Sequence, residues 1–344
     1  MAFQNVPGNA RIKTILRASL GRKRVPPALL FAGPEGSGRR ETALELAKAL
    51  NCRRLEDDAC DDCPSCRAIG AGNHPDIIEV IKLPWDPDKD NNGAEGNGPM
   101  NIDNIRIKQT KRMIELAHMK PMIGRKRVFL IGNADEMEEA AAQSSLKILE
   151  EPPESAQFIL ITSKLDALPP TITSRCRTLA FQPVAFDEIV DDLRGRGVEE
   201  AEARIIASVA RGNLDQAREL GENWEDAREK REEAWNLFRS ILGGSPDFLE
   251  WFASLRKTAV KDELEKILVQ FQGFLRDLLL LGESAESAGL FNPDLEGSLR
   301  AIAPVSDPER VLRMSAAVDG ALLSMERNAN AALLAGAFYA RMTG

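Results

Sequence analysis

The sequence lacks long apolar runs, and no stretch reaches the roughly 18–20 residues that a membrane-spanning helix needs. Its first residues, MAFQNVPGNARIKTIL, also lack the apolar core and small-residue cleavage site of a secretory signal peptide. We therefore expect a cytoplasmic protein without membrane contact. The 344 residues are 43% hydrophobic, which is ordinary for a globular protein, and the length suffices for two or three domains.

An excess of positive charge is also missing, because 45 basic residues against 53 acidic ones give a net charge of −8. A domain that holds nucleic acid by itself is usually basic, and aromatic residues are not interleaved with the positive charges here. Two local basic clusters, RIKTILRASLGRKR and KRMIELAHMKPMIGRKR, have two interpretations. We favour solvated helix faces over DNA contacts.

Strand and helix patterns alternate over residues 1–183, which predicts a parallel α/β sheet. The expected strands are 28–33, 76–81, 127–133 and 157–163, and the expected helices include 104–119 and 138–151. Such sheets bind ligands at the carboxyl ends of their strands. Segment 84–101 is rich in Pro, Gly, Asn and Asp, and we expect it to be a mobile surface loop to which we assign no role.

From residue 184 onward the pattern predicts helices only. Three short helices separated by glycine-containing turns occupy 184–224, and longer amphipathic helices occupy 225–344. One of these helices is predicted to open with a capping box, Ser306 to Glu309, with Pro308 in its first turn.

A glycine-rich turn, GPEGSGRRE, joins the first expected strand to a helix, which is the position of a nucleotide-binding P-loop. Gly33 and Gly38 occupy the two glycine positions of the pattern G-x-x-x-x-G-K-[ST], with Gly36 between them. Arg39 replaces the lysine, and Arg40 replaces the residue whose hydroxyl binds Mg²⁺. We expect ATP or ADP to bind at most weakly, through backbone N–H groups.

The second nucleotide motif is altered as well. In P-loop ATPases an acidic residue that helps hold Mg²⁺ ends the third strand, but here the strand VFLI runs into Gly132 and Asn133. Asp135 and Glu136 follow later. They are either charges at a helix N-terminus, which we favour, or displaced catalytic acids. With both motifs altered, we expect no hydrolysis.

Four of the five cysteines lie in the segment CRRLEDDACDDCPSC, as Cys52, Cys60, Cys63 and Cys66. In a cytosolic chain such spacing predicts a metal site rather than disulfides. Zinc suits four thiolates, and four protein ligands leave no open position, so the site would be structural. Cys176 stands alone and is predicted to be a packing residue, and His74 is predicted to serve a turn.

Two further segments, SSLKILEEPPESAQFILITS and LPPTITSRCRTLAF, closely resemble bacterial replicative clamp loaders of the AAA+ class. In that family LLKxLEEPP follows the second nucleotide motif, SRC carries an arginine finger, and a four-cysteine zinc module follows the P-loop helix. The resemblance is weaker but consistent beyond the α/β part. It implies an AAA+ domain over 1–183 with a zinc module at 52–66, a small helical lid domain over 184–224, and a helical collar for oligomerisation over 225–344.

The departures from the family's ATPase pattern match one of its subunit types. The gamma/tau subunit is the ATPase, whereas delta-prime keeps the fold and the SRC arginine but lacks the ATPase residues. Three departures match delta-prime. They are the two loop arginines, the pair Gly132–Asn133 at the strand end, and Asp215, which stands where gamma/tau has a nucleotide-sensing arginine. The resemblance then implies that Arg175 is an arginine finger that acts in a neighbouring gamma/tau subunit.

This resemblance implies a non-hydrolysing subunit of the DNA polymerase III holoenzyme, a nucleotidyltransferase complex. Its partners would be the gamma/tau and delta subunits, together with the sliding clamp and primed DNA. Two alternatives stay open. A divergent ATP-hydrolysing gamma/tau-like subunit is disfavoured by the missing lysine and acids, and a zinc-stabilised nucleic-acid-binding protein is disfavoured by the acidic net charge.

Overall fold

The computed structural model describes residues 2–81, 105, 107–255, 260–283, 289–303, 307–327 and 329–343. The expected 84–101 loop lies outside this part of the chain. The chain forms two compact units: unit 1 comprises Met1–Ile189 and Gly212–Asp215, and unit 2 comprises Val190–Arg211 and Gln216–Gly344.

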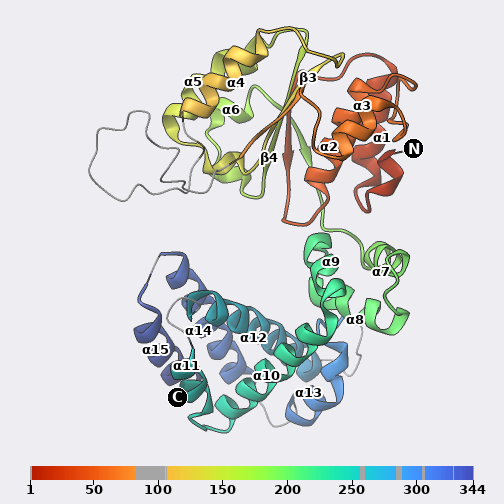
Figure 1. Ribbon diagram of the computed structural model, residues 1–344. Helices are drawn as coiled ribbons and strands as arrows, with labels where there is room; N and C mark the ends of the chain where they lie inside the picture. The colour runs from red at the N-terminus through yellow and green to blue at the C-terminus, as the bar shows by residue number, and fades with distance from the viewer. Residues whose placement is uncertain are drawn as a thin grey trace. The chain divides into compact units, whose positions relative to one another are not determined.

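Unit 1 is built on a five-stranded parallel sheet with the strand order β2-β3-β4-β1-β5 (Figure 1). The strands are β1 (Ala28–Ala32), β2 (Ile77–Val80), β3 (Arg127–Ile131), β4 (Ala156–Thr162) and β5 (Arg177–Ala180). Every residue of β1, β3 and β4 is buried, as expected for central strands covered on both faces. The predicted parallel α/β sheet is therefore confirmed. Edge strand β5 was not predicted, because it is only partly buried.

Helices cover both faces of this sheet (Figure 1). Alternate residues of β1 point into two separate cores: Leu29 and Phe31 pack with residues of α1, α2 and α3, while Leu30 packs with residues of α4, α5 and α6. The helices are α1 (Ala10–Gly21), α2 (Arg39–Asn51), α3 (Pro64–Gly70), α4 (Ile107–Ala117), α5 (Glu139–Glu150) and α6 (Pro170–Thr173), with 3₁₀ helices η1 (Ala2–Asn5), η2 (Ala134–Glu136) and η3 (Leu165–Ala167). Because the strands are parallel, the loops that follow β1 and β3 both lie at the carboxyl edge of the sheet.

The described residues of unit 2 form helices joined by turns and contain no strand. Its core is rich in aromatic residues, with Trp235, Phe238, Phe271 and Phe274 in mutual ring contact. The remaining helices are α7 (Phe186–Gly195), which spans the boundary between the units, α8 (Glu200–Ala210), α9 (Leu214–Glu222), α10 (Trp224–Leu242), α11 (Asp247–Ser254), α12 (Val260–Glu283), η4 (Pro293–Leu295), α13 (Glu296–Ile302), α14 (Pro308–Glu326) and α15 (Ala331–Thr343). The predicted division at residues 224 and 225 stays a prediction.

Helix α14 begins one position from where the capping-box pattern placed it. Pro308 is its first residue, and the N-cap is Asp307, whose carboxylate accepts a hydrogen bond from the Glu309 backbone N–H at 3.2 Å. An aspartate cap meets the same need as a serine cap, since both offer an oxygen to an otherwise unpaired N–H group. Ser306 lies outside the described residues.

Candidate functional site

The glycine-rich loop lies where the P-loop pattern places it, between the end of β1 and the start of α2. Gly36 and Gly38 have φ angles of 64° and 78°, a left-handed conformation that costs a glycine little. Gly33 is required for a different reason, because a Cβ at this position would lie 2.6 Å from the carbonyl oxygen of Phe181. The sequence therefore retains the glycines because the backbone and its neighbours demand them.

The chain itself covers this loop. A Cβ built on Gly36 would lie 1.8 Å from Oδ1 of Asn213, and the Leu214 backbone N–H donates to the Gly36 carbonyl at 2.8 Å. Asn9 also donates through Nδ2 to the carbonyl of Ser37 at 3.0 Å. The space against Gly36 is thus occupied by segment 212–215. This contact could not be predicted from the sequence, because it joins residues far apart in the chain.

Arg39, at the position of the P-loop lysine, is buried with only 9% of its surface exposed. Its Nη1 has no hydrogen-bond partner among the described residues. Burial lowers the pKa of Arg39, and the nearby carboxylates of Glu35, Asp135 and Asp215 oppose that shift. A guanidinium stays protonated in proteins, so the loop holds a fixed positive charge among its own acids.

The other residues predicted for nucleotide chemistry are engaged within the chain. Arg40 donates to both carboxylate oxygens of Glu79 on β2 at 2.9 Å. Asp135 lies in η2, after β3, and accepts a hydrogen bond from Oγ1 of Thr162 at 2.5 Å. Asn133 precedes η2 in a left-handed conformation and donates to Glu136 at 3.3 Å. This placement favours the interpretation of Asp135 and Glu136 as charges in the first turn of a helix.

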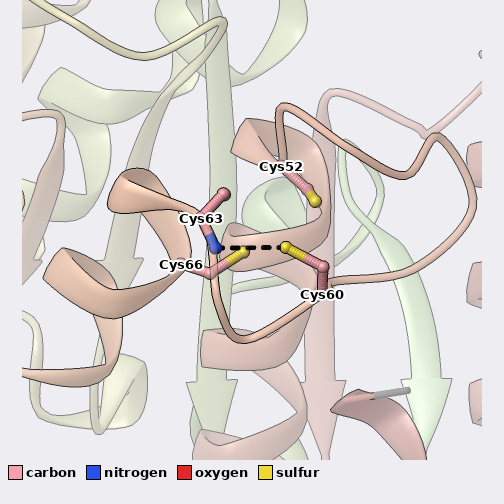
Figure 2. A group of neighbouring side chains, drawn as sticks. All are labelled: Cys52, Cys60, Cys63 and Cys66. Carbon is pink, nitrogen blue, oxygen red and sulfur yellow. Dashed lines mark hydrogen bonds between the residues drawn. The ribbon is translucent and has the colours of Figure 1, made fainter.

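The four clustered cysteines meet at one point (Figure 2). Their sulfur atoms all lie within 4.8 Å of one another. Cys52 ends α2, Cys63 caps the start of α3 and Cys66 lies within α3, with Pro64 at the first position of that helix. Tetrahedral zinc with Zn–S bonds of about 2.3 Å needs sulfurs about 3.8 Å apart, so small movements would close this cluster around an ion.

Backbone groups around the cluster favour thiolates. The N–H groups of Leu55 and Cys63 donate to the sulfurs of Cys52 and Cys60, each at 3.3 Å. Burial raises the pKa of Cys63, but backbone N–H groups and neighbouring thiols outweigh it and lower that pKa to about 6. Burial raises the pKa of Cys66, as does the hydrogen bond with Cys63. The donor set is therefore that of a four-thiolate metal site.

Cys176 and His74 lie outside this cluster. Cys176 is buried in the core beneath α4, α5 and α6, and burial raises the pKa of its thiol to about 11. His74 is buried and interacts with Ser65 through Nε2 at 2.9 Å, while its Nδ1 accepts from the backbone N–H of Asp76 at 3.2 Å. Cys176 is thus a protonated packing residue, and His74 belongs to a buried polar network.

Arg175 lies between α6 and β5, at the amino edge of the sheet. Its Nε and Nη2 donate to Oε2 of Glu150 at 3.0 and 2.9 Å, and its Nη1 donates to the Thr171 carbonyl at 3.0 Å. The glycine loop follows β1 at the opposite, carboxyl edge. Strands β1 and β5 pair in parallel, so roughly 15 Å of strand separates the two edges. Arg175 is therefore placed away from the loop of its own chain.

Comparisons with known proteins show which sequences and structures this chain resembles. A family model described as "DNA polymerase III, delta subunit" matches residues 8–185. DNA polymerase III subunit delta′ of Bacillus subtilis is 29% identical over 327 residues, which is 93% of this chain and 92% of the relative. DNA polymerase III subunit tau of the same organism is 32% identical over 225 residues, or 63% of this chain and 37% of tau. A gamma subunit-related protein from Thermotoga maritima aligns over 97% of both chains with 18% identity and a TM-score of 0.46.

Proposed function

The chain belongs to the DNA polymerase III delta′ family of clamp-loader subunits, and we propose that it works there without hydrolysing ATP. In this role it helps to assemble the loader with gamma/tau and delta subunits and supports loading of the sliding clamp onto primed DNA. The 29% identity to a delta′ subunit over 93% of the chain supports this role.

The observation that carries the proposal is the closed glycine loop. A P-loop ATPase needs a lysine on the phosphates, a hydroxyl on Mg²⁺ and an acid at the end of the third strand. Here Arg39 is buried among its own carboxylates, Arg40 is bound to Glu79, and Asn213 lies against Gly36. These contacts favour a structural role for the loop over an ATPase site.

We further propose that Arg175 acts in trans, on nucleotide bound to a neighbouring gamma/tau subunit. Its place at the edge of the sheet opposite its own glycine loop supports this direction. Three of its five N–H groups are used by Glu150 and Thr171. A guanidinium that reaches a transferring phosphoryl group stabilises its developing charge, an effect worth roughly 10³–10⁵ in rate.

The cysteine cluster would hold one structural zinc ion. Cys52, Cys60, Cys63 and Cys66 supply four sulfurs, and the ion would neutralise the thiolates that the surrounding N–H groups favour. Bound zinc would join the end of α2 to α3 and stabilise this part of unit 1. Because all four ligands come from the chain, the ion would not take part in catalysis.

The helices beyond the sheet would carry the assembly role. We retain the proposed lid domain over 184–224 and collar over 225–344, although the chain packs residues 190–211 into the same unit as the collar helices. None of the described helices is both long and apolar enough to cross a membrane.

Reconstitution tests the proposal. The chain alone should show no magnesium-dependent ATP turnover, and it should form a complex with gamma/tau and delta from the same organism that loads the sliding clamp onto primed DNA. Turnover by the highly purified chain near an ordinary rate of about 1 s⁻¹ would favour the gamma/tau-like ATPase instead. Failure to join the complex would refute the assignment as a loader subunit.

A further inference from the structure

The loop between α4 and β3, residues 118–126, presents large apolar side chains to solvent. Eleven large hydrophobic side chains are exposed among the described residues, and three of them fall within this loop. Met119, Met122 and Ile123 are 50%, 72% and 53% exposed. A cluster of exposed apolar residues often marks an interaction surface.

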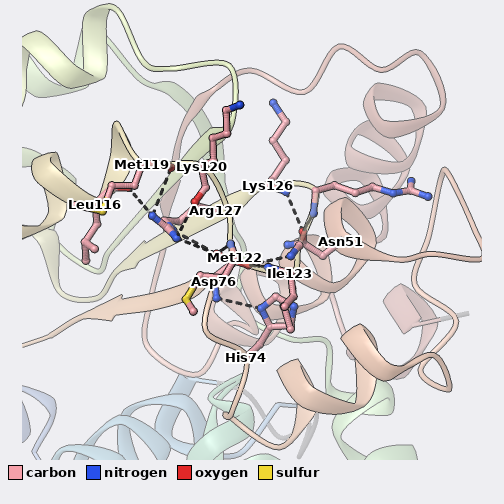
Figure 3. Close-up of polar contacts among 12 residues, drawn as sticks. Asn51, His74, Asp76, Leu116, Met119, Lys120, Met122, Ile123, Lys126 and Arg127 are labelled. Atoms are coloured by element: carbon pink, nitrogen blue, oxygen red, sulfur yellow. Dashed lines mark hydrogen bonds and ion pairs between the residues drawn. The ribbon is translucent and has the colours of Figure 1, made fainter.

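Side chains from other elements nevertheless hold the backbone of this loop through hydrogen bonds (Figure 3). The carboxylate of Asp76, which is fully buried, accepts hydrogen bonds from three consecutive N–H groups. These are the N–H groups of Met122 at 2.7 Å, Ile123 at 2.9 Å and Gly124 at 2.8 Å. One buried side chain therefore fixes the half of the loop that carries the two most exposed apolar residues.

A second buried side chain fixes the next two residues. Oδ1 of Asn51, at the end of α2, accepts from the N–H groups of Arg125 at 2.7 Å and Lys126 at 2.9 Å. A Cβ on Gly124 would lie 2.6 Å from the same oxygen, so glycine is needed for the close approach. Five consecutive N–H groups, 122–126, thus bond to side chains that reach the loop from other elements.

The carbonyl side of the loop is held as well. Arg127 donates through Nη1 to the Leu116 carbonyl at 2.7 Å and through Nη2 to the Lys120 carbonyl at 3.1 Å. Its Nη2 also donates to Oδ1 of Asp76 at 3.1 Å. Arg53 donates to the Ile123 carbonyl at 3.2 Å. This network holds the loop in one conformation, while Met119, Met122 and Ile123 stay exposed among the residues that the structure describes.

Preorganisation of this kind matters most for binding, because a loop that is already ordered loses little conformational entropy when a partner arrives. The charges around the apolar residues indicate the chemistry of that partner. Residues 118–126, HMKPMIGRK, include three basic residues and no acid, and the exposed Arg53 adjoins the loop. A partner with an apolar pocket and negative charge at its rim would complement both features.

Nucleic acid fits this surface less well. Its recognition uses basic side chains together with aromatic rings or polar groups that reach bases, and the loop has no aromatic residue. Its two most exposed apolar positions are aliphatic or thioether side chains. We propose that the 118–126 loop is a preformed docking surface for a folded protein that presents an apolar pocket edged by carboxylates.

The test uses three purified proteins as probes: the gamma/tau subunit, the delta subunit and the sliding clamp of the same organism. This choice of probes rests on the proposed function. Binding of each to the full chain is measured by surface plasmon resonance, with the double variant M122S/I123S, the charge variant K120E/R125E and the control Ile15→Ser. Ile15 is an exposed apolar residue on α1, 42% exposed, away from this loop in sequence.

We expect one of the three probes to lose at least tenfold in affinity for both loop variants and to bind the Ile15→Ser variant like the wild type. The loop variants should keep the far-ultraviolet spectrum and metal content of the wild type. The network uses backbone groups of the loop and the side chains of Asp76, Asn51, Arg53 and Arg127, and the variants change none of these. Probes that bind wild type and loop variants equally would overturn this inference alone. If no probe binds the wild type, the proposed function fails too. A loss confined to binding of primed DNA would overturn the protein-docking proposal and make the loop a nucleic-acid contact.

Discussion

Asn213 lies directly against Gly36, so that a side chain at position 36 would meet its amide oxygen at 1.8 Å. The same segment donates a hydrogen bond from Leu214 to the Gly36 carbonyl. The loop that in an ATPase surrounds phosphate is therefore occupied here by the protein's own chain.

This contact predicts the effect of Gly36→Ala. We expect the free energy of unfolding to fall by about 1–3 kcal/mol, because alanine is strained at a φ of 64°, and its Cβ must also displace Asn213. Urea denaturation measures the loss, and hydrogen exchange should show faster exchange in residues 212–215. Gly336→Ala is the control, since nothing lies near this helical glycine. A Gly36→Ala protein as stable as the wild type would contradict the described contact.

Arg175→Ala should leave the chain folded and impair the assembled loader. Its ion pair with Glu150 is partly exposed, and such pairs contribute about 0–1 kcal/mol. Hydrolysis at the neighbouring site should fall by roughly 10³–10⁵, so total clamp-stimulated ATPase activity falls only partially if other sites keep their own arginines. Arg177→Ala, an exposed residue on β5, is the matched control. Equal rates in wild-type and Arg175→Ala complexes would return Arg175 to a purely structural role.

The cysteine cluster predicts one zinc ion per chain. Cys63→Ser should lose the metal and destabilise the region from Cys52 to α3, because a closed thiolate site contributes folding energy directly. Elemental analysis of protein prepared without chelators gives the metal content, and thermal unfolding gives the stability. Cys176→Ser should keep its zinc, since Cys176 lies in a separate core. Wild-type protein without zinc would refute the site.

Asp76→Asn should be among the most damaging substitutions in unit 1. The change removes the negative charge that pairs with Arg127, whose side chain is also buried. It also offers N–H donors to backbone N–H groups that need acceptors. Loss of one partner of a buried ion pair typically costs about 3–5 kcal/mol, and urea denaturation would measure this. Asp166→Asn, at an exposed position in η3, should change the stability little; similar losses for both variants would argue against the network.

Stability should fall as the pH drops below neutral, partly through His74. Burial lowers the pKa of His74, Asp76 opposes this shift, and Arg53 adds to it. The unfolded chain therefore takes up a proton near the ordinary value of 6.5, whereas the folded chain does so only at a lower pH. The stabilisation is complete above 6.5 and is lost as the pH falls toward the folded-state pKa.

The variant His74→Asn isolates this contribution, because asparagine does not titrate. With zinc present throughout, its free energy of unfolding should depend less on pH between 7 and 5 than that of the wild type. Asp76 does not interfere: burial raises the pKa of Asp76, but the hydrogen bonds to Ile123, Gly124, Met122 and Arg127 outweigh it, so that pKa falls below its ordinary value of 3.8. If the free energy of unfolding depended on pH equally in the wild type and His74→Asn, the assignment of this pH dependence to His74 would be refuted.

The central strands could be predicted because burial on both faces makes them continuous apolar runs, as in β3 and β4. Strand β5 escaped prediction because Arg177 and Thr178 are not buried and break that pattern. The cysteine cluster could be predicted because the four cysteines are close together in the sequence, at a spacing typical of metal sites. The network at residues 122–126 could not be predicted. Asp76 and Asn51 accept hydrogen bonds from backbone N–H groups there, and every residue except proline has such a group, so no residue pattern indicates the contact.

The closing of the loop by segment 212–215 also has a consequence for synthesis on the ribosome. Unit 1 is interrupted: residues 190–211 belong to the other unit, and the Leu214 N–H that bonds to Gly36 comes after them. Domains generally fold from the N-terminus as the chain emerges. We therefore expect the nascent sheet to form with its glycine loop uncovered until segment 212–215 has emerged. Asn213 can reach Gly36 only after that, which would confine the uncovered loop to an early stage in the life of each molecule.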